Sequence, residues 1–186
     1  MVKISKKHIG LGSEHPLCDR IQPIMIILFF IVLAIDSFSF YVFGYSTALI
    51  GLFSFPILLL PAILSLVFGL YFIAKSHKAV LVKKTDKPRF IDSGVYSWVR
   101  HPMYLGILLF CLSFFFISPS LLSLVIWIAF FIIYDRMTIF EEKDLVRILG
   151  KKYIDYQKRV PKWLPKISMH KNKNLSDIRI VSFFSL

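Results

Sequence analysis

Residues 101–134 have the sequence HPMYLGILLFCLSFFFISPSLLSLVIWIAFFIIY, with no Lys, Arg, Asp or Glu among them. A second segment, residues 23–74, also lacks Lys and Arg, and Asp36 is its only acid. A helix needs about 20 apolar residues to cross a bilayer. Because both segments are longer than that, the sequence predicts an all-α membrane protein.

The overall composition fits this class. The chain has 186 residues, 56% of them hydrophobic and 19 of them Phe, with a net charge of +12. A basic protein of this size suggests nucleic-acid binding, but soluble domains are usually only about 45–50% apolar. The basic residues fall into blocks of four, seven and twelve in residues 1–22, 75–100 and 135–186. We therefore expect membrane lipids as partners and no nucleic acid.

Each of the two apolar segments is interrupted once, at residues 44–47 and 117–120. The sequence therefore predicts about four transmembrane helices, at 23–43, 48–74, 102–117 and 119–134. Pro56 and Pro61 are expected to kink the second helix. The third, at 16 residues, is about 24 Å long and shorter than the roughly 30 Å apolar core of a bilayer. The last two helices form a short hairpin.

Four crossings place all three basic blocks on one side of the membrane, which the positive-inside rule assigns to the cytoplasm. Both termini and the active site are then cytoplasmic. The expected organisation is a cytoplasmic N-terminal segment at 1–22, helices within 23–74, a catalytic half at 75–166 and a tail at 167–186. The first apolar segment is too long for a signal peptide and has no small-residue cleavage site.

Cysteine and histidine spacing indicates neither a disulfide nor a metal site. Cys18 lies in a predicted cytoplasmic segment and Cys111 in a membrane helix, so the two are not expected to pair. The five His residues are scattered without an i, i+4 pair. No metal ligand is therefore predicted.

Polar residues suited to ligand binding precede the third predicted helix. Pro102 fits the first position of a helix, which needs no amide hydrogen. Arg100 and His101 then stand at the helix N-terminus, where free amides and the helix dipole favour an anion. The alternative is that Arg100 and His101 only contact lipid phosphates, with Tyr96 and Trp98 forming an aromatic belt at the membrane interface.

Two adjacent carboxylates, Glu141 and Glu142, follow the fourth predicted helix and offer a site for a cation. The alternative is a solvated helix start, with acids stabilised by the dipole. The hairpin brings this cation site and the anion site to the same side of the membrane. A ligand with both charges, such as S-adenosylmethionine, fits the pair, and NADPH is a second candidate that the residues alone do not exclude.

Three segments resemble the isoprenylcysteine carboxyl methyltransferase family, which comprises integral-membrane enzymes that use S-adenosylmethionine. They are GVYSWVRHPMYLG at 94–106, Glu141-Glu142, and GKKYIDYQKRVPKWLP at 150–165. The resemblance covers about residues 88–165. The string Arg-His-Pro-x-Tyr by itself also occurs in phospholipid methyltransferases and sterol reductases, so the specificity comes from the combination with Glu-Glu.

The resemblance implies a cytoplasmic cofactor pocket and a role for individual side chains in it. Glu141 would take the ammonium group of the cofactor, while Arg136 and Glu142 would contact the substrate. The implied cofactor-binding residues are Phe90, Ile91, Tyr96, Arg100, His101, Pro102, Met103, Tyr104 and Glu141. Two departures stand out. Pro88 replaces a frequent His of the family, and Arg136 precedes Glu141 by five residues where four are usual, a change of about 100° around a helix.

The implied reaction is direct displacement at the sulfonium methyl group, with an isoprenylcysteine-like or other lipid-like substrate as acceptor. An ionised carboxylate needs no general base, so we predict no catalytic side chain and expect the protein to orient the reactants and exclude water. The glycines form no phosphate-binding loop of the Rossmann type. The alternatives are phospholipid N-methylation, an NADPH-dependent reductase of the sterol-reductase type, and a non-enzymatic protein that binds anionic lipid. The oligomeric state stays open.

Overall fold

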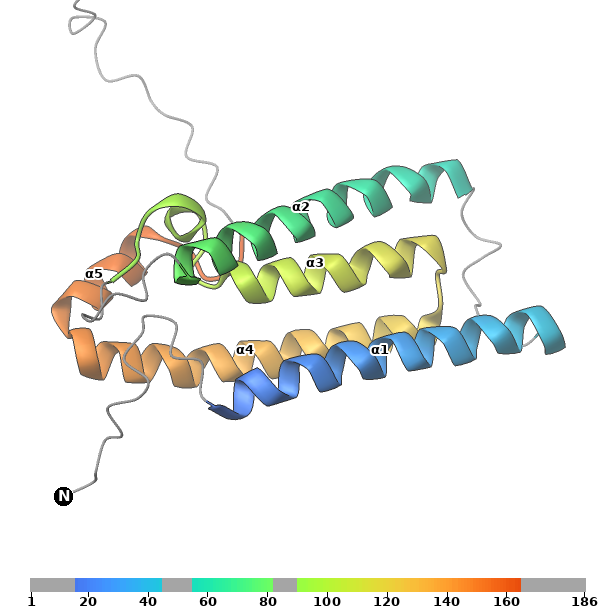
Figure 1. Cartoon of the computed structure of the whole chain (residues 1–186), viewed down its shortest axis with the longest axis horizontal. Helices are drawn as coiled ribbons and strands as arrows, with labels where there is room; N and C mark the ends of the chain where they lie inside the picture. Colours follow the sequence, from blue (N-terminus) through green and yellow to red (C-terminus); the bar gives the residue numbers. More distant parts are fainter. Residues whose placement is uncertain (1–15, 45–54, 82–89, 165–186) are drawn as a thin grey trace, which may run out of the picture.

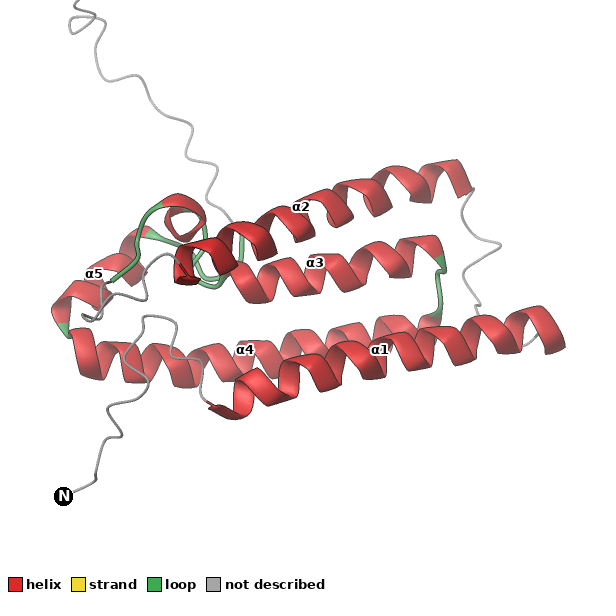
Figure 2. Cartoon of the chain, viewed as in Figure 1, coloured by secondary structure: helices red, strands yellow, loops and turns green. Residues whose placement is uncertain are grey.

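The computed structural model describes residues 16–44, 55–81 and 90–164, and in this part of the chain helices are joined by loops and turns, with no strand (Figures 1 and 2). Four long helices lie lengthwise beside one another, and two short ones close one end of the bundle. The helices are α1 (Pro16–Phe43), α2 (Phe55–Leu81), η2 (Gly94–Ser97), α3 (Pro102–Ile117), α4 (Leu121–Leu149) and α5 (Lys151–Arg159). The predicted all-α class is confirmed.

The four long helices form two pairs, α2 with α3 and α1 with α4 (Figure 1). A buried cluster joins the pairs, with Phe29 of α1, Leu108 of α3 and Phe130 of α4 among its members. Trp127 of α4 donates its indole N–H to the backbone oxygen of Leu108 at 2.8 Å. The apolar cluster and this hydrogen bond hold α3 between the other helices.

The pair α2–α3 depends on two glycines that face each other. A Cβ atom on Gly69 would lie 2.8 Å from the backbone nitrogen of Phe110 and 3.0 Å from the backbone oxygen of Gly106. A Cβ on Gly106 would lie 3.0 Å from the backbone oxygen of Gly69. Small residues allow such close backbone approach between membrane helices. The absence of side chains here sets the distance between α2 and α3.

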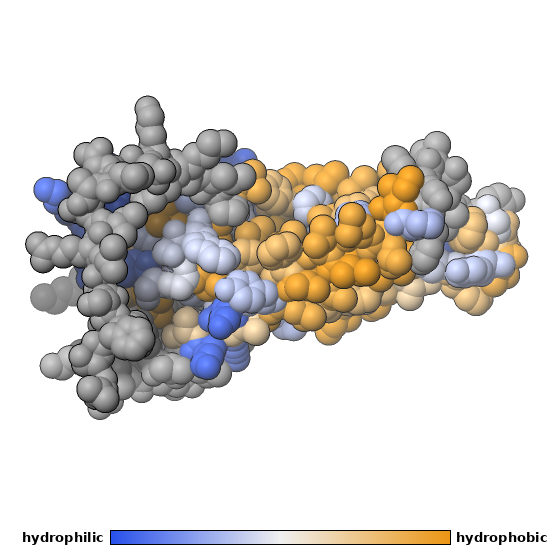
Figure 3. Space-filling view, turned by 90° about the horizontal axis from the view of Figure 1, so that it is seen from above, coloured by the Kyte–Doolittle hydropathy of each residue, from blue (hydrophilic) through white to orange (hydrophobic). Residues whose placement is uncertain are grey.

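The outer surface of the bundle is apolar along its middle, and hydrophilic residues gather at one end (Figure 3). Within the described residues, α1, α2 and α4 contain spans long and apolar enough to cross a membrane, and α3 is a shorter apolar helix. Large side chains such as Leu60 and Phe38 are 64% exposed. In water this surface would be unstable. The protein is therefore an integral membrane protein.

The ends of α3 and α4 that lie away from the polar end meet in a tight turn. Ser120 precedes α4, and its hydroxyl accepts the backbone N–H of Ser123 at 3.2 Å. The hydroxyls of Ser118 and Ser37 lie 3.0 Å apart, which links this turn to α1. These contacts satisfy polar groups at helix ends, which would otherwise be costly to bury.

The predicted end of the fourth helix is wrong. The sequence predicts it at residue 134, but α4 continues to Leu149, so Glu141 and Glu142 lie on this helix and not beyond it. The prediction was based on hydropathy, which falls after Tyr134. A helix can continue through polar residues, because many of them have a high helix propensity. It ends at Gly150, whose φ of 58° lies in the left-handed region. The hairpin therefore has one short helix, α3.

The other helix boundaries also differ from the prediction. The first helix begins at Pro16, earlier than expected, and α2 ends at Leu81, later than expected. Pro56 lies in the first turn of α2, where its missing N–H costs nothing, so its position gives no reason for a kink. The predicted helix start at residue 48, Pro88 and the tail 167–186 lie outside the described residues.

Adding one methyl group at the α2–α3 contact is expected to destabilise the bundle. Gly69→Ala should lower stability by about 1–3 kcal/mol because backbone atoms of α3 must shift, although Ala favours a helix more than Gly does. Thermal unfolding of the protein in detergent measures the change. Ala129→Val, which enlarges an exposed side chain of α4, is the control. An unchanged unfolding temperature for Gly69→Ala would contradict the close contact.

Candidate functional site

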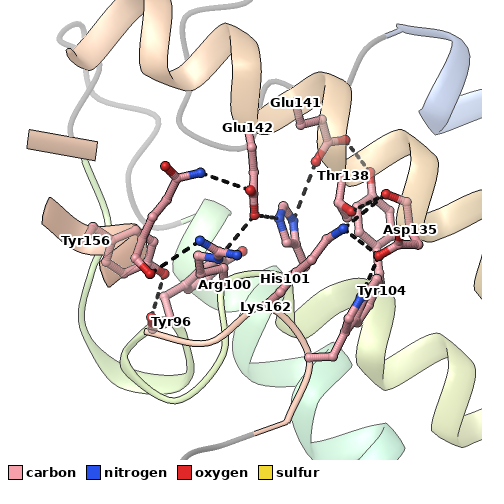
Figure 4. Close-up of polar contacts among 12 residues, drawn as sticks. Tyr96, Arg100, His101, Tyr104, Asp135, Thr138, Glu141, Glu142, Tyr156 and Lys162 are labelled. Carbon is pink, nitrogen blue, oxygen red and sulfur yellow. Dashed lines mark hydrogen bonds and ion pairs between the residues drawn. The ribbon is translucent and has the colours of Figure 1, made fainter. Parts of the chain in front are cut away.

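A pocket lies at the polar end of the bundle, between the segment that precedes α3, the second half of α4, and α5 (Figure 4). It contains about 560 Å³ of empty space, part of it open to solvent. Its lining residues are Phe90, Ile91, Tyr96, Arg100, His101, Pro102, Met103, Tyr104, Glu141, Leu145, Tyr153 and Tyr156. The structure thus brings together all nine residues predicted to bind the cofactor. Their binding role stays a prediction.

Local structure holds the first part of the pocket in place. Gly94 starts η2 with a φ of 65°, a conformation that favours glycine. Val95 and Val99 are buried against Phe72 of α2. The backbone N–H of Arg100 donates to the backbone oxygen of Pro161, at 2.9 Å. Residues 94–101 are therefore fixed on one side by α2 and on the other by the segment after α5.

A half-buried polar network forms around Glu142 (Figure 4). Its Oε1 lies 3.1 Å from Nε of Arg100 and 3.0 Å from Nε2 of His101. Gln157 of α5 donates its side-chain amide to Oε2 of Glu142 at 2.9 Å. A buried charge is stable only with such partners. The carboxylate of Glu142 therefore joins α4, α5 and the segment before α3.

Glu141 occupies a different place from its neighbour. The hydroxyl of Tyr104 donates to Oε1 of Glu141, and Oε2 lies 3.7 Å from Nδ1 of His101. The ring of Tyr104 stacks on buried Tyr134, with centroids 5.0 Å apart. Glu141 is thus a carboxylate at the pocket wall, positioned by an aromatic pair of α3 and α4.

The protonation state of His101 follows from its surroundings. Burial lowers the pKa of His101 below its ordinary value. The hydrogen bond and charge of Glu142 raise it, and the charges of Arg100 and Lys162 lower it further. The net direction is downward, so His101 is neutral at pH 7 and acts through hydrogen bonds.

An aromatic wall faces this polar side. Phe90 makes edge-to-face contacts with Tyr153 and Tyr156, at centroid distances of 6.0 and 5.1 Å. Tyr156 donates its hydroxyl to the backbone oxygen of Tyr96 at 2.6 Å. Burial raises the pKa of both tyrosines, so they are neutral. Sequence reasoning missed Leu145, Tyr153 and Tyr156, although Tyr153 and Tyr156 belong to the segment that carries the family resemblance.

The segment after α5 is fastened to α4 by contacts that the sequence did not predict. Nζ of Lys162 donates to Oδ1 of Asp135 at 2.5 Å, and the indole N–H of Trp163 donates to the same oxygen at 2.9 Å. The ring of Trp163 lies against Phe131 and His101, with centroids 5.5 and 6.2 Å away. Residues 160–164, which we call the strap, therefore pass beside His101.

Two predicted substrate contacts do not line the pocket. Arg136 is exposed and stands on the part of α4 before Glu141. Glu142 is held by Arg100, His101 and Gln157. Their proposed contact with substrate stays a prediction. Within the described ranges, no cluster of three or more His, Cys, Asp or Glu is arranged to hold a metal ion.

Residues 41–152, more than half of the chain, match the model of the phospholipid methyltransferase family. The chain belongs to the phospholipid methyltransferase family. The matched residues include α2, α3, α4 and most of the pocket lining.

Curated relatives support the resemblance stated above. Protein-S-isoprenylcysteine O-methyltransferase of Mus musculus is 35% identical over 99 residues, or 49% of this chain and 32% of that protein. Its counterpart in Saccharomyces cerevisiae is 36% identical over 92 residues, or 47% and 37%. Methanethiol S-methyltransferase of Pseudomonas deceptionensis is 33% identical over 111 residues, or 59% and 40%.

These matches confirm the resemblance to isoprenylcysteine carboxyl methyltransferases. The matched region spans well under half the length of each of these curated relatives. All three are named methyltransferases, which disfavours the reductase alternative.

Removing the carboxylate that anchors the strap is expected to loosen it. Asp135→Ala leaves Lys162 and the indole of Trp163 without their acceptor and should lower stability by about 1 kcal/mol, because the site is partly exposed. Thermal unfolding and limited proteolysis after α5 measure the loss. Asp144→Ala, which removes an exposed partner of Arg147, is the control and should change little. Equal behaviour of the two variants would mean that the strap does not depend on Asp135.

Proposed function

We propose that the protein is an integral-membrane methyltransferase that uses S-adenosylmethionine. The observation that carries the proposal is a pocket, at the end of an apolar bundle, that pairs a carboxylate with an aromatic wall. Membership of the phospholipid methyltransferase family supports it. The methyl donor carries an ammonium group, a carboxylate and an adenosine. A site for it needs an anion, a cation and apolar surfaces, and this pocket has all three.

The residues present fit the cofactor group by group. The carboxylate of Glu141 is suited to the ammonium group. Arg100 lines the pocket beside its partner Glu142 and supplies positive charge for the carboxylate. Phe90, Tyr153 and Tyr156 offer apolar faces to the adenosine, as aromatic side chains commonly do. His101, Pro102, Met103 and Tyr104 form the side of α3, where the methionine part would lie.

The chain's contribution to the reaction is binding, orientation and exclusion of water. When bound, S-adenosylmethionine supplies an electrophilic methyl group on its sulfonium. A lone pair of the acceptor forms the new bond to that carbon as the carbon–sulfur bond breaks, and the bonding electrons remain on sulfur. An acceptor carboxylate needs no proton transfer, so no basic side chain is required. The buried aromatic walls keep water from competing.

The acceptor that the resemblance favours is a prenylated or other lipid-like carboxylate. An apolar bundle surrounds the polar pocket, so a lipid-like substrate can reach it from the membrane. We place the pocket and the termini on the cytoplasmic side, because the Lys and Arg residues of the described segments gather at the pocket end and the positive-inside rule assigns that end to the cytoplasm.

A thiol is the second candidate acceptor, and two observations favour it. Arg136, the residue implied to hold a substrate carboxylate, is exposed and absent from the pocket lining. The match to methanethiol S-methyltransferase of Pseudomonas deceptionensis also covers more of this chain, 59%, than the matches to the isoprenylcysteine enzymes of mouse and yeast. A neutral thiol needs no cationic partner, and its proton passes to water at the open part of the pocket as the new carbon–sulfur bond forms.

Cofactor binding is tested by calorimetric titration of the detergent-purified protein with S-adenosylhomocysteine and, separately, with NADPH. We expect binding of the first and none of the second. Glu141→Ala should weaken binding by roughly 2 kcal/mol, about 30-fold, because a buried ammonium loses its counter-charge. Asp144→Ala removes an exposed carboxylate from the same helix and is the control. Absence of S-adenosylhomocysteine binding by the folded wild type would refute the proposed function.

The acceptor is tested with a radiolabelled methyl donor and three substrates: N-acetyl-S-farnesylcysteine, methanethiol and phosphatidylethanolamine. A prenylcysteine methyl ester, which releases methanol in base, is the expected product. Arg136→Ala should then reduce kcat/KM for this substrate by about tenfold or more if the guanidinium holds the carboxylate. Dimethyl sulfide as the main product, with no effect of Arg136→Ala, would select the thiol.

A further inference from the structure

The side chains of the segment before α3 divide between the pocket and the outer surface. Arg100 and His101, which the sequence also offers as lipid contacts, are both held by Glu142. Tyr96 lines the pocket. Trp98, by contrast, is 49% exposed. Contact between this segment and membrane lipid therefore depends on Trp98.

Trp98 belongs to a row of side chains that joins it to α2. Its ring stacks on that of Tyr71, with centroids 6.2 Å apart and an angle of 25° between the planes. Nζ of Lys75 lies 5.9 Å from the centroid of the Tyr71 ring, within the range of a cation–π contact. Tyr71 is 38% exposed, and Lys75 is exposed as well. We call Lys75, Tyr71 and Trp98 the interfacial row, which presents an ammonium and two aromatic rings to the outside.

The interfacial row stands where the apolar surface of α2 ends. Residues 55–74 include no charged residue, and outward-facing side chains such as Leu60 and Val67 are 64% and 57% exposed. Lys75 is the first charged residue along the helix, and Lys78 follows on the same side, three residues later. Figure 3, seen from the α2 side of Figure 1, shows hydrophobic residues giving way to hydrophilic ones toward the pocket end. This level of α2 is therefore the membrane interface, where Trp and Tyr are enriched.

The charges at this level suit an anionic ligand. Lys75 and Lys78 are exposed, and neither pairs with a carboxylate of the residues that the structure describes. A lysine at this depth lays its carbon chain along apolar surface and extends its ammonium to the headgroups, where a negatively charged membrane surface attracts it. A zwitterionic headgroup carries a cation of its own, which the two lysines repel. A phospholipid with net negative charge is therefore the better partner.

We propose that the interfacial row binds the headgroup of an anionic phospholipid. The ammonium of Lys75 holds the phosphate, and the rings of Tyr71 and Trp98 pack against the glycerol region and the upper part of an acyl chain. Both rings combine an apolar body with a polar group, which suits them to this boundary. The inference does not depend on the proposed function.

A lipid in this position contacts two segments of the chain at once. Val95 and Val99, on either side of Trp98, are buried against Phe72 of α2. A lipid that packs on Tyr71 and Trp98 therefore strengthens the contact between α2 and the segment that carries part of the pocket lining. Since it binds the folded protein only, it also raises the unfolding temperature.

Native mass spectrometry of the detergent-purified protein resolves individual bound lipids and provides the first test. With phosphatidylglycerol and phosphatidylcholine of identical acyl chains, we expect the first phosphatidylglycerol to bind at least fivefold more tightly. Lys75→Gln should lower this preference about fivefold, equivalent to ~1 kcal/mol for one cation near an anionic membrane surface. Lys151→Gln, which removes an exposed charge from α5, is the matched control and should keep the preference.

Tryptophan fluorescence tests where the lipid binds. Bromine atoms on an acyl chain quench a tryptophan that they contact, and Trp98→Phe identifies the part of the emission that comes from Trp98. We expect brominated phosphatidylglycerol to quench that part more than brominated phosphatidylcholine does. Trp98→Ala should weaken the binding of both lipids, because the aromatic surface is lost, and should abolish the rise in unfolding temperature caused by phosphatidylglycerol.

Equal affinities of the wild type for the two lipids would reject the proposal and leave an aromatic belt without a lipid site. Equal losses in Lys75→Gln and Lys151→Gln would also reject it, because the attraction would then come from the whole basic surface. If Trp98→Ala does not fold, the Lys75→Gln affinities and the Trp98→Phe fluorescence decide. None of these measurements needs the cofactor, so a failure to bind S-adenosylhomocysteine would refute the proposed function and leave the lipid site to its own tests.

Discussion

The need to neutralise one half-buried carboxylate organises the polar end of this protein. Glu142 stands on α4, and its partners come from the segment before α3 and from α5. A half-buried carboxylate that lost these partners would be less stable, so the contacts favour keeping the three segments together. The pocket walls are these same segments. The charge network is thus the frame of the site, and the apolar bundle serves mainly to place that frame at the membrane surface.

The sequence revealed the helices and most of the pocket for different physical reasons. A long apolar segment in a membrane forms a helix because its backbone N–H and C=O groups find no water to bond with there. The presence of α1, α2 and α3 could therefore be predicted from the distribution of charged residues. The extension of α4 past Tyr134 was missed because a polar helix carries no hydropathy signal. The contact between Asp135 and Lys162 joins residues 27 positions apart, and no local pattern indicates which distant cation a carboxylate will meet.

The pocket residues were recognised through family resemblance and not through spacing. Glu141 and Glu142 are neighbours in sequence with the same chemistry, and nothing local predicts that one faces the pocket while the other is bound by Arg100. A helix turns about 100° per residue, so adjacent carboxylates must point in different directions. Their division of labour is a consequence of helix geometry, once α4 is known to continue through both.

The shortness of α3 has a consequence for the lipid environment. Its 16 residues rise about 24 Å, and it begins at the pocket, so the pocket floor lies closer to the opposite leaflet than the ends of α2 and α4 do. A bilayer adapts to a short apolar element by thinning around it. The acyl-chain length of the lipids then affects the position of the site: in a thick membrane the pocket lies below the headgroups, and in a thin membrane it lies in water.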